Sequence, residues 1–178
     1  MTKAIWNVDK VHSTIGFTVR HMMISNVKGT FNDFEGTVEG DPNDLTDASI
    51  EVNIHANSID TRMPDRDDHL RSADFFDMEN HPNLTFKATN MEKKSDNHYD
   101  VTGDFTIRGT TKPVTFDIIF EGIAKDPMSG EEAAGFTGST KINRKDFGLT
   151  WNAALETGGF VVSDEVKINI EIQVRKQD

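Results

Sequence analysis

The stretch VKINIEIQV, residues 166–174, alternates apolar and polar side chains without interruption. Successive side chains of a β-strand point to opposite faces of its sheet, so one face of this segment is apolar and the other is polar. Such an alternation predicts a long strand that packs one face against a core and exposes the other to water. The apolar face is formed by Val166, Ile168, Ile170, Ile172 and Val174.

The same two-residue period recurs along the chain and predicts seven further strands. One of them, residues 27–38, alternates in two phases that meet at Asn32 and Asp33, which predicts a β-bulge at this point. Turn-forming clusters such as residues 41–44 and 126–130 join several of the segments. The other six predicted strands are residues 15–21, 50–56, 84–88, 99–107, 114–120 and 134–142.

Glycine occurs repeatedly inside these predicted strands, where it would weaken an ordinary flat sheet. In a strongly curved sheet, glycine relieves crowding where the strands bend. The positions are Gly16, Gly29, Gly36, Gly103, Gly122 and Gly138. We therefore predict an all-β fold in which eight antiparallel strands close into a barrel, with an interior wide enough for one small ligand.

The composition limits the class of protein and the partners that it can bind. A chain of 178 residues suits one domain, and no repeat or linker divides residues 1–178. The net charge of -11 argues against nucleic acid as a partner, because phosphate binding requires clustered Lys and Arg. The absence of cysteine excludes disulfides and thiolate chemistry. The N-terminal segment lacks the apolar core of a secretory signal and no apolar run could span a membrane, so we expect a soluble, cytoplasmic protein.

Two long segments interrupt the strands, at residues 60–82 and 144–159. Long loops in a compact domain are usually functional and often serve as lids. In the first segment, Pro64 suits the first turn of a helix, and the acidic residues after it complement the helix dipole. Asp67 and Arg71 are four residues apart with the acid first, which favours an ion pair. We predict a short amphipathic helix here, lying as a lid over the mouth of the barrel.

The lid segment also permits a catalytic interpretation. Asp65 and His69 are four residues apart on the predicted helix and could form an acid–base pair. However, the chain contains neither the H-E-x-x-H pattern of zinc helices nor the G-x-S-x-G turn of serine hydrolases. We therefore predict a protein that is not an enzyme and has no catalytic or metal-ligating residues. An enzyme that acts on an apolar substrate through lid Asp and His residues remains the alternative.

A basic cluster, Lys141, Arg144 and Lys145, stands at the start of the second long segment. Such a cluster can touch an anionic membrane surface transiently, despite the negative charge of the whole chain. The alternative is an ordinary solvated loop.

Three sets of residues resemble the YceI-like family of polyisoprenoid-binding proteins. They are HSTIGFTVRHMMISNVKGTFNDFEG (12–36), RDDHLRSADFFDMENHPNLTF (66–86), and the shorter blocks GDFTIRGTTKPVTF from Gly103, RKDFGL from Arg144 and SDEVKINI from Ser163. The resemblance implies a lipocalin-like barrel, often dimeric, with a long apolar pocket. The pocket would hold a polyisoprenoid, an isoprenoid quinone or a similar long-chain amphiphile. The family has no agreed catalytic residues, and many relatives are exported, whereas this chain shows no export signal.

The expected function is to bind a long-chain isoprenoid lipid and to carry or buffer it reversibly, without any other cofactor. His21, at the end of an apolar face, would hydrogen-bond the headgroup, and the flexible thioethers of Met22 and Met23 would contact the tail. A barrel whose side chains fill the interior fits the alternation equally well, and would suit a structural or stress-related protein without ligand. The predicted ligand-binding residues are Phe17, Val19, His21, Met22, Met23, Phe31, Ile54, Leu70, Phe75, Phe76, Phe86, Phe105, Ile107, Phe116, Ile118, Phe136 and Ile170.

Overall fold

The computed structural model describes residues 4–153, 155 and 159–177. Strands dominate it, with one α-helix, α1 (Pro64–Arg71), and two short 3₁₀ helices, η1 (Ala56–Ser58) and η2 (Arg144–Phe147), in this part of the chain. None of the helices in the described residues is long and apolar enough to cross a membrane. The strands are β1 (Ile5–Val8), β2 (Thr14–His21), β3 (Ser25–Phe31), β4 (Phe34–Asp41), β5 (Asp44–His55), β6 (Ile59–Asp60), β7 (Asn83–Ser95), β8 (His98–Ile107), β9 (Thr110–Lys125), β10 (Glu132–Asn143) and β11 (Val162–Lys176).

Within the described residues, eight antiparallel strands form a closed ring in the order β1, β4, β5, β7, β8, β9, β10, β11, which confirms the predicted barrel. The pairing of β1 with β11 closes the ring, with Val8 opposite Val174. Strand β11 is long enough to pair with β10 along one side, and with both β1 and β2 along the other. The alternating stretch 166–174 therefore holds three neighbours together, and every apolar position in it faces the interior or its wall.

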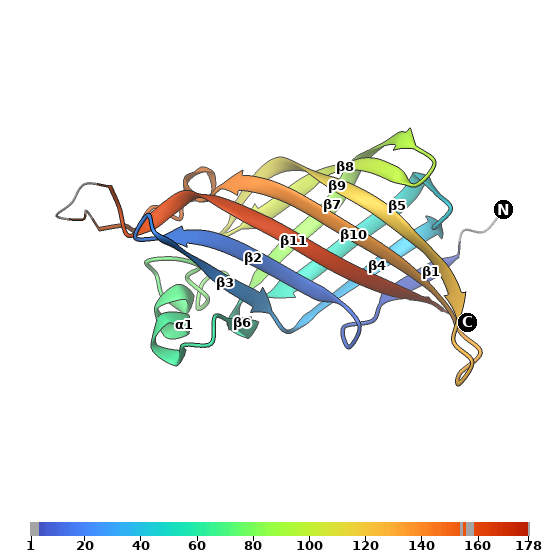
Figure 1. Cartoon of the computed structure of the whole chain (residues 1–178), viewed down its shortest axis with the longest axis horizontal. Helices are drawn as coiled ribbons and strands as arrows, with labels where there is room; N and C mark the ends of the chain where they lie inside the picture. The colour runs from blue at the N-terminus through green and yellow to red at the C-terminus, as the bar shows by residue number, and fades with distance from the viewer. Residues whose placement is uncertain (1–3, 154, 156–158, 178) are drawn as a thin grey trace.

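The strands β2, β3 and β6 extend the sheet at one end of the barrel, beside α1. Figure 1 shows this end at the left and both chain termini at the opposite end. We call the end that carries α1 and the β2–β3 turn the mouth. At the other end, Trp6, Leu45 and Tyr99 are almost completely buried, and the Tyr99 hydroxyl donates a hydrogen bond to the Asn43 carbonyl at 3.3 Å. The barrel is therefore packed with side chains at the end opposite its mouth.

The predicted bulge in residues 27–38 is instead a boundary between two strands, β3 and β4. The interruption at Asn32 and Asp33 lets both Phe31 and Phe34 face inward, with exposed fractions of 6% and 3%. The chain changes partners at this point, since β3 pairs with β2 and β6, whereas β4 pairs with β1 and β5. The change in the phase of alternation at Asn32 and Asp33 does mark an interruption of the strand. It marks the point where the chain changes neighbouring strands, and not an extra residue within one strand.

At two of the predicted positions inside the strands, glycine makes room for an aromatic ring of the neighbouring strand. A Cβ atom on Gly103 would lie 2.5 Å from the ring of Phe86 on the neighbouring strand β7. The ring of Phe17 similarly occupies the space beside Gly29 on β3. At both positions a side chain would clash with an aromatic ring of the adjacent strand.

Candidate functional site

The described residues enclose an apolar cavity of about 270 Å³ beneath α1, at the mouth of the barrel. Side chains of β2, β3, β8 and β11 form its walls, and residues of both predicted lid segments cover it. Ten of the predicted ligand-binding residues line this mouth cavity: Phe17, Val19, His21, Phe31, Ile54, Leu70, Phe75, Phe76, Phe105 and Ile107.

A second apolar cavity of about 120 Å³ lies deeper in the barrel. Two of those ten predicted residues also line this inner cavity, and five further predicted residues line it alone. The interior is thus hollow, and the alternative of a barrel filled solidly by its own side chains is wrong. The predicted residues of the inner cavity are Ile54, Phe86, Phe105, Phe116, Ile118, Phe136 and Ile170.

Four side chains separate the two cavities, because they line both: Ile15, Ile54, Phe105 and Ile168. Phe105 is the largest of the four, and its ring contacts those of Phe86, Phe116 and Phe147 at centroid distances of 5.9, 6.4 and 6.0 Å. The resemblance implied one long pocket, whereas the structure has two compartments with an aromatic partition.

Met22 and Met23, which were predicted to contact the ligand, line neither cavity. They form the turn between β2 and β3 and are 42% and 56% exposed. The strand period stops at His21, so the side chains of the turn point outward and not along the apolar face.

The lid helix begins at Pro64, as predicted, but its charges are arranged differently from the prediction. Asp67 is buried, and one carboxylate oxygen accepts hydrogen bonds from the backbone N–H and the hydroxyl of Thr61, at 2.9 and 2.5 Å. Arg71 pairs with Asp68 at 2.9 Å and not with Asp67. Asp67 therefore fastens the helix to the segment that precedes it, while the Asp68–Arg71 pair lies at the surface.

Three aromatic rings join the two lid segments above the mouth cavity. Trp151, from the second segment, contacts His69 and Phe75 of the first, with centroids 4.7 and 5.4 Å apart. Phe76 contacts the ring of Phe31 on β3 edge to face at 5.7 Å. The predicted lid is thus built from both long segments, and it meets the barrel wall through Phe76.

His69 lines the mouth cavity, but its Nε2 lies 2.9 Å from an Asp74 carboxylate oxygen. His69 thus pairs with Asp74 and not with Asp65, and both partners belong to the first lid segment. The imidazole of His69 also contacts the rings of Phe75 and Trp151 edge to face.

Arg144 belongs to the predicted basic membrane cluster, yet it is almost completely buried. Its guanidinium donates to the carbonyl oxygens of Leu149 (2.5 Å), Trp151 (3.0 Å) and Ser163 (2.9 Å), and it lies 3.7 Å from the Asp164 carboxylate. Burial lowers the pKa of Arg144, and the negative charge of Asp164 opposes this shift. Arg144 therefore fixes the backbone of the second lid segment.

The other two members of the basic cluster also have partners. Lys145 lies 3.4 Å from Asp164, and Lys141 lies 4.0 Å from Glu165. One cation of the cluster is buried and the other two, which are exposed, lie beside carboxylates, so a membrane contact through this cluster stays a prediction.

The ionisable side chains around the mouth cavity are all basic, although the whole chain is strongly acidic. They are Arg20, His21, Arg66, His69 and Arg144, and none of the described lining residues is an acid. Arg66 is held in place by hydrogen bonds from its guanidinium to the hydroxyl and carbonyl of Thr61, at 2.8 and 2.7 Å. A headgroup that accepts hydrogen bonds would meet donors on this rim, whereas a cationic headgroup would be repelled.

Sequence reasoning missed Trp151, Arg66, Arg20 and Arg144, all of which line the mouth cavity. Trp151 and Arg144 lie outside the strands, where no period predicts the direction of a side chain, and Arg20 lies on the polar face of its strand. A tryptophan within a long loop of a polar chain was the one available signal, because such a residue is rarely left fully in water.

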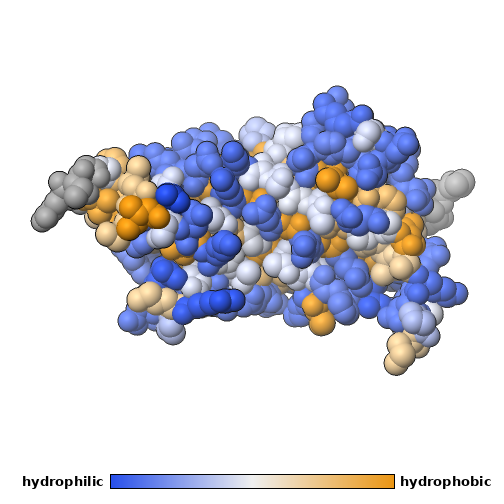
Figure 2. Space-filling view, in the orientation of Figure 1, coloured by the Kyte–Doolittle hydropathy of each residue, from blue (hydrophilic) through white to orange (hydrophobic). Residues whose placement is uncertain are grey.

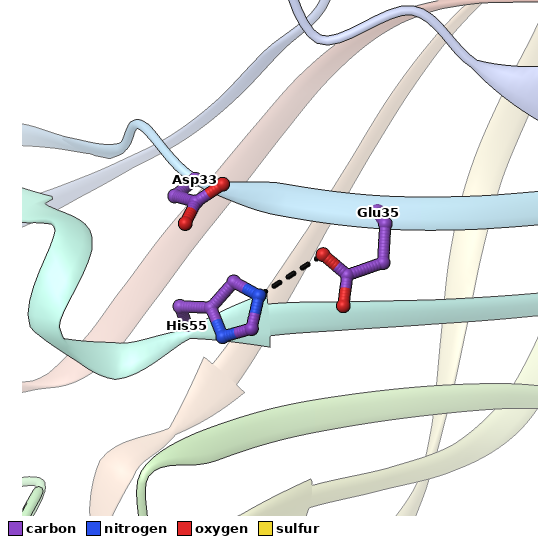
Figure 3. Close-up of side chains that lie close together, drawn as sticks. All are labelled: Asp33, Glu35 and His55. Carbon is purple, nitrogen blue, oxygen red and sulfur yellow. Dashed lines mark hydrogen bonds and ion pairs between the residues drawn. The ribbon is translucent and has the colours of Figure 1, made fainter.

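Two clusters of acids and histidine lie on the outer surface, away from the cavities. In the first, His55 Nε2 lies 3.0 Å from a Glu35 oxygen, with Asp33 beside them (Figure 3). Asn53 hydrogen-bonds Glu35, which lowers the pKa of that carboxyl, and the contact with His55 lowers it further. The second cluster joins His98, Asp100 and Asp117 on β8 and β9. The carboxylates of the first cluster already have cationic or hydrogen-bonding partners, as in ordinary surface ion pairs.

Comparison with known proteins gives a consistent result across the chain. The model of the YceI-like domain matches residues 6–174. A UPF0312 protein of Staphylococcus epidermidis is 46% identical over 94% of both chains, and one of Staphylococcus aureus is 41% identical over 89% of this chain and 90% of its own.

Solved structures share the barrel. BcnA of Burkholderia cenocepacia superposes with a TM-score of 0.81 at 25% identity, over 93% of this chain and 98% of its own. The YceI protein of Campylobacter jejuni gives 0.77 at 32% identity, over 89% and 90%. A polyisoprenoid binding domain from Saccharophagus degradans gives 0.75 over 97% and 98%, but at 14% identity it shows only that the fold is shared.

Proposed function

Because the chain belongs to the YceI-like family, we propose that it binds the apolar tail of a long-chain isoprenoid lipid inside the barrel and carries or buffers that lipid reversibly. The observation that carries this proposal is the apolar mouth cavity beneath a lid, with hydrogen-bond donors at its rim. Ligand sites in proteins are typically pockets of about 300–1,000 Å³ with an apolar lining and a few polar groups, and the mouth cavity lies near the lower end of this range.

Reversible exchange follows from where such a lipid is found. Moving an aliphatic chain out of water gains about 0.8 kcal/mol per CH₂ group. An isoprenoid lipid starts in a bilayer, however, whose interior is as apolar as the cavity, so most of this gain cancels. Affinity must then come from shape and from contacts to the headgroup. Arg20, His21 and Arg66 at the rim are the groups that we assign to the headgroup, which favours a lipid with hydrogen-bond acceptors.

The proposal includes three further points that the site itself does not decide. We propose that the ligand is a polyisoprenoid or an isoprenoid quinone, that the carrier is a cytoplasmic homodimer, and that it meets membranes transiently. Sedimentation of the purified protein tests the dimer, and fractionation of the cells that make it tests the location.

In the direct experiment, purified, delipidated protein is incubated with liposomes that contain an isoprenoid quinone. The protein is then re-isolated, and its mass is measured by native mass spectrometry. We expect an adduct with the mass of the quinone. Val19→Trp, which places a large ring in the mouth cavity, should abolish the adduct, whereas Thr18→Trp, on the opposite face of β2, should keep it. A bare protein mass, from a barrel that still takes up an apolar dye, would show that the ligand is a different one.

A further inference from the structure

The turn at the tip of the β2–β3 hairpin exposes three consecutive large apolar side chains. Met22 is 42% exposed, Met23 56% and Ile24 75%. Phe160, which is 54% exposed, lies in the neighbouring segment, where the Met22 N–H donates to the carbonyl of Val161 at 2.8 Å. Figure 2 shows an apolar patch at this end of the molecule, the mouth end in the same view as Figure 1. We call Met22, Met23, Ile24 and Phe160 the apolar tip.

The conformation of the turn makes its sequence unexpected. Met22 and Met23 have φ angles of 52° and 65°, both in the left-handed region. Hairpin turns with positive φ at successive residues favour Asn and Gly, because other side chains are strained in this conformation. Two methionines here are worse for folding than Asn-Gly would be, and their side chains fill no cavity. The stability of the fold therefore does not explain why these residues occupy the turn.

The hairpin that carries the apolar tip is also free of acidic residues. Residues 10–32 contain no Asp or Glu, although the chain has 30 of them, and they include Lys10, Arg20 and Lys28. A bilayer surface is neutral or negative, so an acid-free hairpin can approach it without the repulsion that most of this protein would meet. The charge distribution thus singles out this part of the surface for contact with lipid.

The apolar tip adjoins the opening of the mouth cavity. Arg20 and His21, immediately before the turn, line the cavity, and so do Val161 and Val162, immediately after Phe160. His21 and Val162 are paired across β2 and β11. A surface that held the apolar tip would therefore face the entrance of the cavity directly.

We propose that the apolar tip inserts into the interfacial layer of a phospholipid bilayer and so docks the mouth of the barrel on the membrane. The purpose of docking rests on the proposed lipid carriage, but the docking itself does not. Exposed apolar side chains beside basic ones are typical of segments that lie in the headgroup region of a bilayer. A second copy of the chain is a poorer partner for the apolar tip. A stable dimer buries about 800 Å² on each partner, which is more than a three-residue turn and one phenylalanine supply.

The test compares wild type with the double variant Met22→Asn, Met23→Gly in flotation with phosphatidylcholine vesicles, with and without added phosphatidylglycerol. We expect the fraction bound to either vesicle to fall about tenfold in the variant, because two apolar side chains leave the interface. The thermal midpoint should stay equal or rise, because Asn-Gly fits the turn. Met128→Asn, an equally simple change at a 93% exposed methionine in the β9–β10 turn, should bind vesicles as wild type does.

Vesicle binding by the double variant at the wild-type level would overturn the proposal. If sedimentation instead showed that the variant loses a dimer while its vesicle binding is unchanged, the apolar tip would be a contact between copies. Uptake of an apolar dye by the wild-type barrel in the absence of vesicles tests the cavity separately. Vesicle docking without any dye uptake would therefore refute lipid carriage and leave the docking surface intact.

Discussion

The rings of His69 and Trp151 meet edge to face above the mouth cavity, with their centroids 4.7 Å apart. Four of the eight strands of the ring, β7 to β10, lie between the two residues in sequence, and each residue belongs to a different long segment. Their contact, together with Phe75, is the point at which the two parts of the lid hold each other closed. A ligand that enters from the mouth must therefore part these rings or pass beside them.

Trp151→Ala should open the lid without damaging the barrel. An aromatic pair contributes about 0.5–1.5 kcal/mol beyond the area that it buries, and Trp151 makes two such contacts. We expect faster uptake and faster release of an apolar dye in stopped-flow measurements, by roughly a factor of ten or more. Trp151→Phe, which keeps a ring at this position, should lie between the variant and wild type. Unchanged rates would show that ligands enter by another route.

Asp67→Ala should loosen the lid helix from its base. The carboxylate accepts from the backbone N–H and hydroxyl of Thr61, and removal leaves these buried donors without a partner. Such a loss costs about 1–3 kcal/mol of unfolding free energy, which urea denaturation can measure. Asp68→Ala, at the adjacent exposed ion pair, should change stability little. Equal effects of the two changes would contradict the anchoring role of Asp67.

The barrel wall could be predicted from the sequence because strand geometry is strictly periodic. Once residues 166–174 and their counterparts are recognised as strands, Phe17, Val19 and Ile170 must share the inner face. The structure places all three in cavity walls. The short strand β1 escaped notice because four residues are too few to show a period.

The mouth could be predicted only in part, because no period governs loops. Met22 and Met23 were assigned to the ligand because they lie just beyond a predicted strand and carry flexible thioethers, but the chain turns at this point. Arg144 was interpreted as a surface cation, since its four carbonyl acceptors come from backbone that only tertiary folding brings together. The partition at Phe105 was equally hidden, because alternation tells which side chains point inward but not how much space remains between them.

Acid should weaken the junction where β11 closes the barrel. Burial raises the pKa of Asp9, but hydrogen bonds from Arg175, His12 and Val11 outweigh this and lower the pKa to about 2 from 3.8. Because the folded pKa is the lower one, the ionised carboxylate stabilises the fold above pH 3.8, by at most about 2 kcal/mol, and this contribution is lost as the pH falls toward 2.

Asp9→Asn isolates this contribution. Urea unfolding should show the variant to be less stable than wild type at neutral pH, and the two curves should converge as the pH falls from 3.8 toward 2. A difference in unfolding free energy that stayed constant over this range would assign the effect of the substitution to packing and not to charge.

Phe105→Ala should join the two cavities into one channel. Phe105 is the largest of the side chains that line both, and its removal leaves a passage between the mouth cavity and the inner cavity. We expect the variant to bind longer prenyl alcohols than wild type does, measured as the chain length at which displacement of an apolar dye stops improving. Its stability should fall by about 3–5 kcal/mol, the usual cost of truncating a buried phenylalanine.

Phe136→Ala is the matched control, because it removes the same atoms from a residue that lines the inner cavity alone. The variant should lose stability to a similar extent but keep the wild-type limit on chain length, since the partition is intact. If both variants accept longer alcohols equally, the increase reflects a softened barrel and the partition does not set the length of the ligand. If neither does, the inner cavity is not part of the binding site, and the tail must lie wholly between the lid and the partition.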